Sequence, residues 1–323
     1  MMDRRIVATF AVAAAVCGAS AATAVATPPG RNGQIVWQQE SFAAPPHLWV
    51  ANPDGSAARQ VFAEDQAATF EAAFSPASAS SLAFTRGTPE PFSEEIFVSD
   101  LVTGQKRQVT NSRNASVAPA FSPDGTRMVF FSVRPPGRNH PPGPERIAVI
   151  GVDGTGLKYL TPQNRSSIDP DYSPDGTMIA YGESRPGGYS GDNRLMVMNA
   201  DGSHRRAVTP YGGRREINPK WLPDGSGLVF ESLDRRSRKS DIERVALDGS
   251  ARRTVLATSA FETNPVPSPD GTRIAFTSDR DRRGPTRLGP GTEVYTMKLD
   301  GTDIVRLTTN QAPDLFPDWQ RLP

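Results

Sequence analysis

Short segments of alternating apolar and polar residues recur along most of the chain, and turns rich in glycine and proline separate them. Residues 127–131 and 273–277 are examples, because each contains β-branched and aromatic side chains and directly follows a Pro-Asp-Gly turn. Alternation with a period of two is typical of a strand that buries one face. Beyond residue 26 no segment has the period of an amphipathic helix. The pattern therefore predicts an all-β fold.

The strands belong to a repeat that two turn markers define. The first marker is a turn proline, usually in Pro-Asp-Gly, with spacings of 47, 51, 49 and 46 residues. The second is a turn glycine, usually in Asp-Gly, with spacings of 49, 50, 48, 47 and 52 residues. Both turns reverse the chain, so each unit holds four short strands. The prolines are Pro76, Pro123, Pro174, Pro223 and Pro269, and the glycines are Gly55, Gly104, Gly154, Gly202, Gly249 and Gly301.

The way the repeat begins and ends predicts how the fold closes. Units of four antiparallel strands around a ring form a β-propeller, which protects its strand edges by closing on itself. Residues 316–320 match the innermost strand of a unit, whereas residues 34–38 match a second strand. We therefore expect a six-bladed β-propeller over residues 33–323, with the C-terminal strand completing the first blade.

The N-terminus has the features of a secretory signal. Arg4 and Arg5 precede an apolar run that ends at Val16, and Ala24-Val25-Ala26 fits a small-x-small cleavage site. The apolar run is too short to cross a bilayer comfortably. We expect residues 1–26 to be a signal peptide and residues 27–32 a short linker, which places the protein in the periplasm, cell envelope or medium without a stable membrane span. Retention as an anchor is the alternative.

Composition narrows the classes of partner. The chain has 36 Lys+Arg against 35 Asp+Glu, so its net charge of +1 favours neither nucleic acid nor an anionic membrane surface. Its single cysteine, Cys17, lies inside the predicted signal. The mature chain would therefore lack disulfides, thiol nucleophiles and thiolate metal ligands.

The repeat resembles that of the TolB-like β-propeller family. The resemblance rests on the aromatic-Ser-Pro-Asp-Gly-x-x-Ile-Ala-Phe segment, the following Val-Met-Asn-x-Asp-Gly segment and a closing Leu-Thr, and it covers residues 33–320. Two copies depart from the pattern, at Pro76-Ala77-Ser78 and at Leu222. TolB itself carries an N-terminal α/β domain that this sequence lacks. The resemblance implies a secreted propeller that mediates interactions.

Long variable loops between second and third strands gather on one face of such a propeller. Loops of ten or more residues on a scaffold of tight turns are usually functional or disordered. Two of them, at 232–241 and 278–292, are rich in arginine, and guanidinium groups pair well with carboxylates and phosphates. The alternative is a solvated arginine-rich surface. The candidate binding residues are Arg235, Arg236, Arg238, Arg282 and Arg283.

The innermost strands open with polar residues that should converge at the mouth of the central channel on this loop face. The candidates are Asp169, Asn218, Asn264 and Asp314. A ring of oxygen ligands could hold a hard cation such as calcium, which is the one cofactor that we consider. The alternative is hydrogen bonding between neighbouring blades.

No catalytic constellation stands out. The three histidines, His47, His140 and His204, fall at unrelated places of the repeat, so they do not suggest a metal triad or a His-based nucleophile site. No Gly-x-Ser-x-Gly motif is present. We therefore expect a monomeric, non-catalytic propeller that binds a protein or cell-envelope polymer. The alternative is a carbohydrate-active enzyme, a glycosidase or lyase, that uses carboxylates at the channel mouth.

Overall fold

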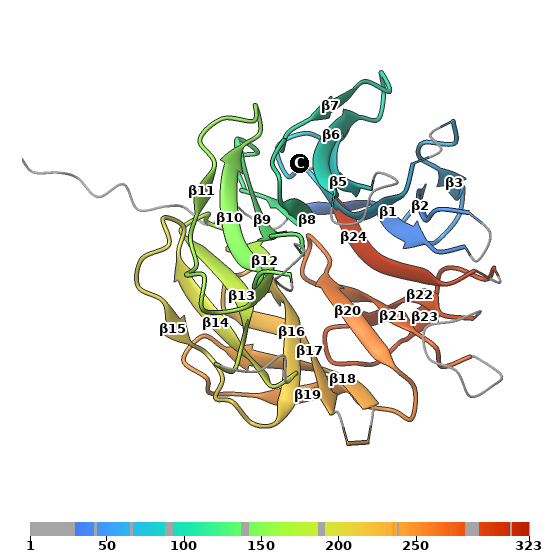
Figure 1. Cartoon of the computed structure of the whole chain (residues 1–323). Coiled ribbons are helices and arrows are strands. Elements are labelled where there is room, and N and C mark those ends of the chain that lie inside the picture. Colours follow the sequence, from blue (N-terminus) through green and yellow to red (C-terminus); the bar gives the residue numbers. More distant parts are fainter. Residues whose placement is uncertain are drawn as a thin grey trace, which may run out of the picture.

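The computed structural model is an all-β propeller, as the sequence pattern predicts (Figure 1). It describes residues 30–41, 44–64, 67–87, 93–136, 142–186, 191–234, 236–237, 239–281, 291–310 and 312–322. Within these ranges the chain forms 24 strands and no helix. The predicted signal peptide lies outside them.

Four of the sheets have four strands each, in the arrangement expected of a blade. The first joins β24 (Asp314–Leu322), β1 (Arg31–Gln39), β2 (His47–Ala51) and β3 (Arg59–Gln60). The second joins β4 (Thr69–Phe74), β5 (Ser81–Arg86), β6 (Glu95–Asp100) and β7 (Lys106–Gln108). The third joins β8 (Ala115–Phe121), β9 (Arg127–Val133), β10 (Arg146–Gly151) and β11 (Lys158–Tyr159). The fourth joins β20 (Glu262–Pro267), β21 (Arg273–Ser278), β22 (Glu293–Lys298) and β23 (Val305–Arg306).

The other eight strands form one sheet, which corrects the expectation of six separate blades. They are β12 (Ser167–Tyr172), β13 (Met178–Ser184), β14 (Asn193–Asn199), β15 (Arg206–Ala207), β16 (Arg214–Trp221), β17 (Gly227–Asp234), β18 (Lys239–Ala246) and β19 (Arg253–Leu256). Two copies of the repeat meet here through one parallel pair, Asn193 with Arg215. A hydrogen bond accompanies this pair: the backbone N–H of Gly213, just before β16, donates at 3.0 Å to the carboxylate of Asp192, just before β14.

The ring closes as predicted. The C-terminal strand β24 pairs antiparallel with β1, and Trp319 lies opposite Ile35. The Trp319 indole N–H also donates to the Val266 carbonyl at 3.2 Å, which ties the closing strand to the preceding sheet. Strand β1 already begins at Arg31, so the last two residues of the predicted linker belong to the propeller.

The hydrophobic core lies between adjacent sheets. Ile147 and Val149 of one sheet, for example, pack in the same cluster as Tyr181 and Met196 of the next. The repeated Leu-Thr ending contributes a buried hydroxyl, as in Thr161, which accepts the backbone N–H of Ile147 at 2.9 Å. Apolar side chains thus fill the space between the sheets, and the centre of the ring is left to the innermost strands.

Each innermost strand carries one irregularity that aims side chains at the central channel. The residue before the repeat's proline position has a φ between 49° and 53°, the left-handed region that most side chains avoid. A shift of register follows it, for example between Ile168 and Asp171 in β12. The six left-handed residues are Glu71, Ala118, Asp169, Asn218, Asn264 and Phe316.

Candidate functional site

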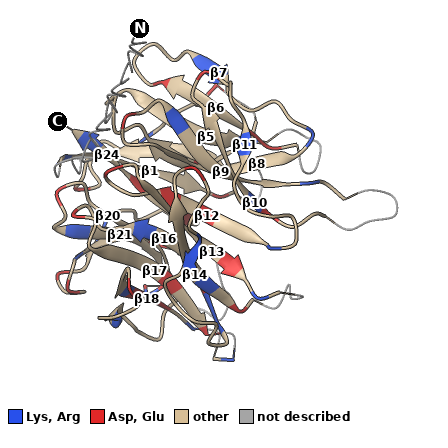
Figure 2. Ribbon diagram, turned by 90° about the vertical axis from the view of Figure 1, so that its left-hand side faces the viewer, with Lys and Arg blue, Asp and Glu red and all other residues tan. Residues whose placement is uncertain are grey.

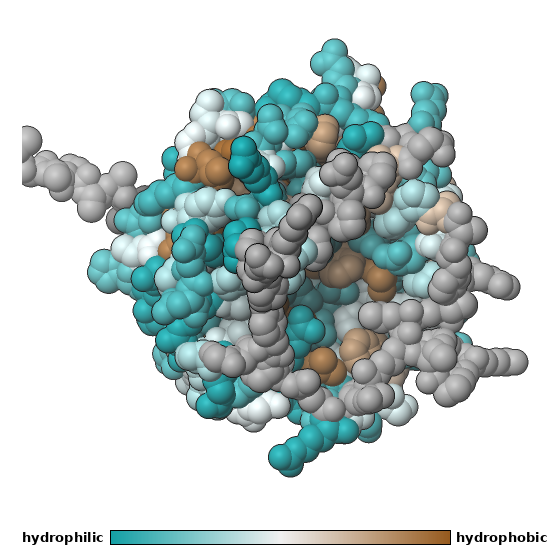
Figure 3. All heavy atoms as spheres, in the orientation of Figure 1, coloured by the Kyte–Doolittle hydropathy of each residue, from teal (hydrophilic) through white to brown (hydrophobic). Residues whose placement is uncertain are grey.

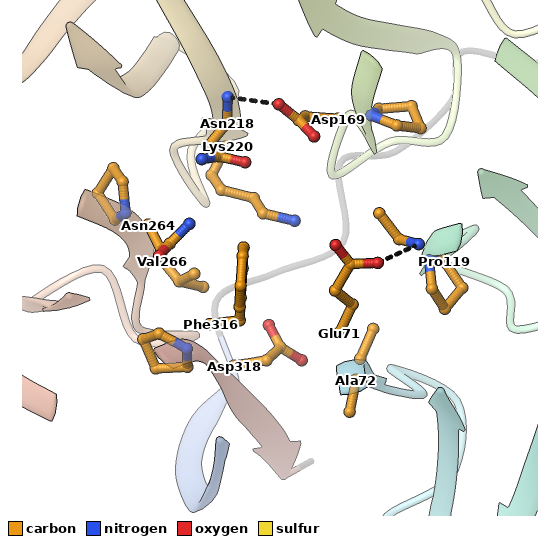
Figure 4. A pocket seen from close by; sticks show the side chains of 15 residues that line it. Glu71, Ala72, Pro119, Asp169, Asn218, Lys220, Asn264, Val266, Phe316 and Asp318 are labelled. Atoms are coloured by element: carbon orange, nitrogen blue, oxygen red, sulfur yellow. Dashed lines mark hydrogen bonds between the residues drawn. The ribbon is translucent and has the colours of Figure 1, made fainter. Parts of the chain in front are cut away.

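The left-handed residues surround a channel that has a narrow and a wide part. The narrow part, about 80 Å³, is lined by the proline positions and the residues that flank them (Figure 4). The wide part, about 670 Å³, is lined by the starts of inner strands, such as Ile168, and by the ends of second strands, such as Ser184 and Leu233. It therefore opens on the face of the long loops, and we refer to it as the mouth.

The structure places three of the four predicted channel residues at the mouth and corrects the fourth. Asp169, Asn218 and Asn264 line both parts of the channel. Asp314 does not, because it lies three residues before Pro317, and the bulge at that proline turns Phe316 inward instead. The buried Asp314 carboxylate accepts the side-chain amide of Gln39 at 3.0 Å.

Sequence reasoning missed Glu71, which faces the channel from β4. Its copy of the repeat is degenerate and has Ala72 where the others have proline. When that copy is aligned on its turn proline, Pro76, Glu71 takes the position that Asp169 has in its own copy. The repeat therefore contained the information needed to predict that Glu71 faces the channel. The Glu71 carboxylate accepts the backbone N–H of Ala118 at 3.0 Å, and the Asp169 carboxylate accepts that of Asn218 at 3.3 Å. One role of these carboxylates is therefore to join neighbouring repeat units.

A second layer of carboxylates, also missed, lies two residues further along the inner strands. Asp171 accepts the backbone N–H of Trp221 at 3.0 Å, and Asp318 accepts that of Phe74 at 2.8 Å. Lys220 Nζ lies 3.4 Å from Asp171 Oδ1. In Figure 4 the Lys220 side chain extends into the pocket that Asp318 also lines. This lysine fills part of the narrow end of the channel, so the mouth is the roomier part.

Burial dominates the electrostatics of this layer. Burial raises the pKa of Asp318 to about 6 and also raises the pKa of Asp171, although the Lys220 ammonium opposes both changes. For Lys220 itself, burial would lower the pKa, but the carboxylates of Asp171 and Asp318 outweigh it and the pKa is raised. The lysine therefore stays charged while its partners are poised to take up protons.

The carboxyl groups at the mouth are perturbed in the same direction. Burial, with a smaller contribution from the charge of Asp169, raises the pKa of Glu71 to about 7. Burial raises the pKa of Glu231 to about 7, although a hydrogen bond from Asn218 opposes this rise. Burial also raises the pKa of Asp169. Strongly perturbed carboxyl groups in a cavity are a mark of functional sites.

The role of the two arginine-rich loops in binding stays a prediction. Arg235, Arg238, Arg282 and Arg283 lie outside the described residues. Arg236 is exposed, and its backbone N–H donates to the Asp234 carboxylate at 2.8 Å. Elsewhere acidic and basic residues are interspersed over the sheets (Figure 2).

Outside the channel, the described surface has few large hydrophobic side chains that are exposed. Figure 3 shows mostly hydrophilic residues, with hydrophobic ones scattered among them. Val102, at 84% exposed, is the most exposed of the large apolar side chains in the described ranges, and it lies in a turn. In the described ranges no three His, Cys, Asp or Glu residues are placed to hold a metal ion. No helix long and apolar enough to cross a membrane occurs there either.

Comparison with known proteins agrees with this architecture. A family described as TolB beta propeller domain matches residues 34–288. A TolB homolog of Chlorobium luteolum is 33% identical over 159 residues, 48% of this chain and 32% of that protein. The Tol-Pal system protein TolB of Anaeromyxobacter dehalogenans is 28% identical over 176 residues, 54% of this chain and 37% of that protein. The crystal structure of TolB from Acinetobacter baumannii superposes with a TM-score of 0.71 at 22% identity, over 89% of this chain and 66% of that one.

These matches have a limited extent. The matched part of the chain spans about a third of the length of the two curated relatives. The solved structure, at 22% identity, supports the fold alone.

Proposed function

The chain belongs to the TolB β-propeller domain family, and from this premise we propose that it is a non-catalytic binding propeller of the cell envelope, periplasmic or secreted. Its partner would be a protein or an envelope polymer. The relatives' names support this setting, because one of them is a Tol-Pal system protein. The predicted signal peptide supports it independently, since it would deliver the chain across the inner membrane.

We also propose that the ring is a set of six repeat units. What supports this count is the division of the eight-stranded sheet into two copies of the repeat, β12–β15 and β16–β19, that share one parallel pair. Counted in this way, the sheets supply six innermost strands, each with one left-handed residue at the channel. Six units leave room for a channel that can receive part of a ligand.

The observation that carries the binding proposal is the mouth on the loop face. It offers about 670 Å³, a size typical of pockets that hold small ligands or the tip of a partner. Charged groups such as Asp169, Glu231 and Arg215 line it together with Phe131, Phe261 and other apolar side chains. Polar groups set among apolar side chains in a cavity give orientation and specificity.

Site-specific photo-crosslinking tests this proposal. A photoreactive residue replaces Leu233 at the mouth, and a matched control replaces Val102, an exposed turn residue away from the mouth. In cells of the source organism we expect a specific adduct from position 233 and none from position 102. Equal labelling from both positions, or no adduct from 233, would contradict binding at the mouth.

A second function, a carbohydrate-active enzyme, is favoured by one observation. The pKa of Glu71 and that of Glu231 are both raised to about 7, which suits a general acid at neutral pH. Incubation with envelope glycans separates the two functions. Turnover that Glu71→Gln or Glu231→Gln abolishes would establish the enzyme and overturn the non-catalytic proposal.

A further inference from the structure

Arg215 has a guanidinium group without a partner at the mouth. It lies in β16 and lines the 670 Å³ cavity. Other arginines near this face are paired: Arg214 donates to Asp241 at 2.9 Å and Arg194 to Glu183 at 2.8 Å. The side chain of Arg215 makes no hydrogen bond or close ion pair with any residue that the structure describes, although its charge opposes the rise in the pKa of Asp169 and of Glu231 from a longer distance. Since a guanidinium carries five donors in a planar fork, such a group is ready for a ligand's carboxylate.

The surroundings of Arg215 form a platform with two charged ends. In the β16–β17 hairpin Arg215 lies opposite Leu233, and Ile217 lies opposite Glu231. All four side chains line the mouth, so they share one face of the hairpin. Arg215 and Glu231 are diagonal neighbours, which places their backbone positions about 7–8 Å apart, and the apolar residues Ile217 and Leu233 occupy the other diagonal.

The acidic end of the platform is deep in the mouth. Glu231 is 4% exposed, and its Oε2 accepts the side-chain amide of Asn218 at 3.1 Å. Asp169 faces the same space from the other repeat unit of this eight-stranded sheet, and Glu71 faces it from a different sheet. In Figure 4 one oxygen of each of these two carboxylates points away from its backbone donor into the pocket. Buried carboxylates that are only partly satisfied gain most from an ammonium group.

We infer that the mouth binds a short peptide through its free termini. The ligand's ammonium group would lie beside Glu231, in the space that Asp169 and Glu71 also face, and its carboxylate on the guanidinium of Arg215. The backbone between them would cover Ile217 and Leu233. A dipeptide extends about 7 Å, at 3.3–3.6 Å per residue, which is similar to the spacing of the two backbone positions that carry the charged side chains. This inference rests on the mouth being the binding face, as proposed above.

Ligands with one charge fit the mouth less well. A simple anion on Arg215 would lie close to several carboxylates, and the low dielectric of a cavity strengthens their repulsion. A simple cation would satisfy the carboxylates but leave Arg215 without a partner. A zwitterion satisfies both ends at once, so the two interactions support each other.

Calorimetric titration with three matched dipeptides tests the inference. Ala-Ala carries both charges, acetyl-Ala-Ala only the carboxylate, and Ala-Ala-amide only the ammonium group. We expect Ala-Ala to bind about tenfold to hundredfold more tightly than either blocked form, since each loses one charge-assisted contact. Equal binding of Ala-Ala and Ala-Ala-amide would reveal a simple cation site and overturn the inference.

Two variants and a control assign the contacts. Arg215→Gln should weaken Ala-Ala to the level of Ala-Ala-amide and leave the amide's own binding unchanged, whereas Glu231→Gln should weaken both. Arg253→Gln, an exposed arginine in β19, is the control and should change nothing. Thermal unfolding of each variant shows whether it is folded. If no dipeptide binds while the crosslink at position 233 forms, the inference fails and the proposed function stands.

Discussion

The carboxylates of the channel and those of the turns differ in the surroundings that set their pKa values. In the Pro-Asp-Gly turn, Asp124 accepts the Ser122 hydroxyl at 2.5 Å and the Thr126 backbone N–H at 3.0 Å, and these bonds hold its pKa below the usual range. In the channel, burial raises the pKa of Glu71 to about 7. The turn aspartates recur because the turn recurs, and they stabilise it. The channel carboxylates vary from unit to unit and cost stability when charged, which is the mark of groups kept for binding.

The largest expected effect concerns the one lysine of the channel. Lys220→Met removes the counter-ion of Asp171 and Asp318, both partly buried, so we expect the free energy of unfolding to fall by about 3 kcal/mol at pH 8. The loss should shrink near pH 5, where protonated carboxyl groups no longer need a counter-ion. Denaturant unfolding at the two pH values measures both.

A double variant and a surface variant serve as controls for Lys220→Met. Adding Asp171→Asn to Lys220→Met should recover part of the stability, because one uncompensated charge is gone. Lys298→Met, at an exposed ion pair with Asp303, should change stability by less than about 0.5 kcal/mol. A Lys220→Met loss that is the same at pH 5 and pH 8 would contradict the electrostatic account.

The next largest effect concerns Glu71, whose raised pKa determines the direction in which stability changes with pH. Its folded pKa of about 7 lies above its ordinary value of 4.5, so its contribution to stability is fully present below pH 4.5 and is lost as pH rises through about 7. Glu71→Gln should therefore be more stable than the wild type by about 2 kcal/mol at pH 8, and equal to it near pH 4.5. Unfolding curves across this range test it. A variant that is less stable at pH 8 would show that the charged carboxylate stabilises the fold.

The smallest effect belongs to the turns. Asp124→Ala should lower the free energy of unfolding by about 1 kcal/mol, because the three local hydrogen bonds that the carboxylate accepts are lost. The pKa of Asp124 is lowered, so its contribution is present above pH 3.8 and is lost only below it. The loss should therefore be constant between pH 5 and pH 8. A loss that varies over this range would remove the distinction between turn and channel carboxylates.

The repeat made much of the fold predictable. The turn residues mark every hairpin, and the unpaired ends of the chain indicate that β24 completes the first blade, as the structure confirms. The single pair that joins two units, Asn193 with Arg215, could not be predicted, because it is accompanied by a contact between Gly213 and Asp192, which lie outside the repeat's pattern.

The channel was only partly predictable for a related reason. Asp169, Asn218 and Asn264 follow from the repeat, since each precedes a proline. The prediction for Asp314 was wrong because the first residue of a strand does not determine which side chain faces the channel. The bulge at the proline determines it, and in β24 the inward-facing residue is Phe316. Arg215 lies outside the repeat's pattern, so only the three-dimensional structure reveals it as an unpaired group at the mouth.

The difference between the two regions can be measured directly by carboxyl ¹³C NMR titration of the folded protein. The account predicts midpoints near 7 for Glu71 and Glu231, a midpoint below 3.8 for Asp124, and a fall of the first two when Ala-Ala is added. Midpoints near 4.5 for both glutamates, unchanged by the dipeptide, would contradict it.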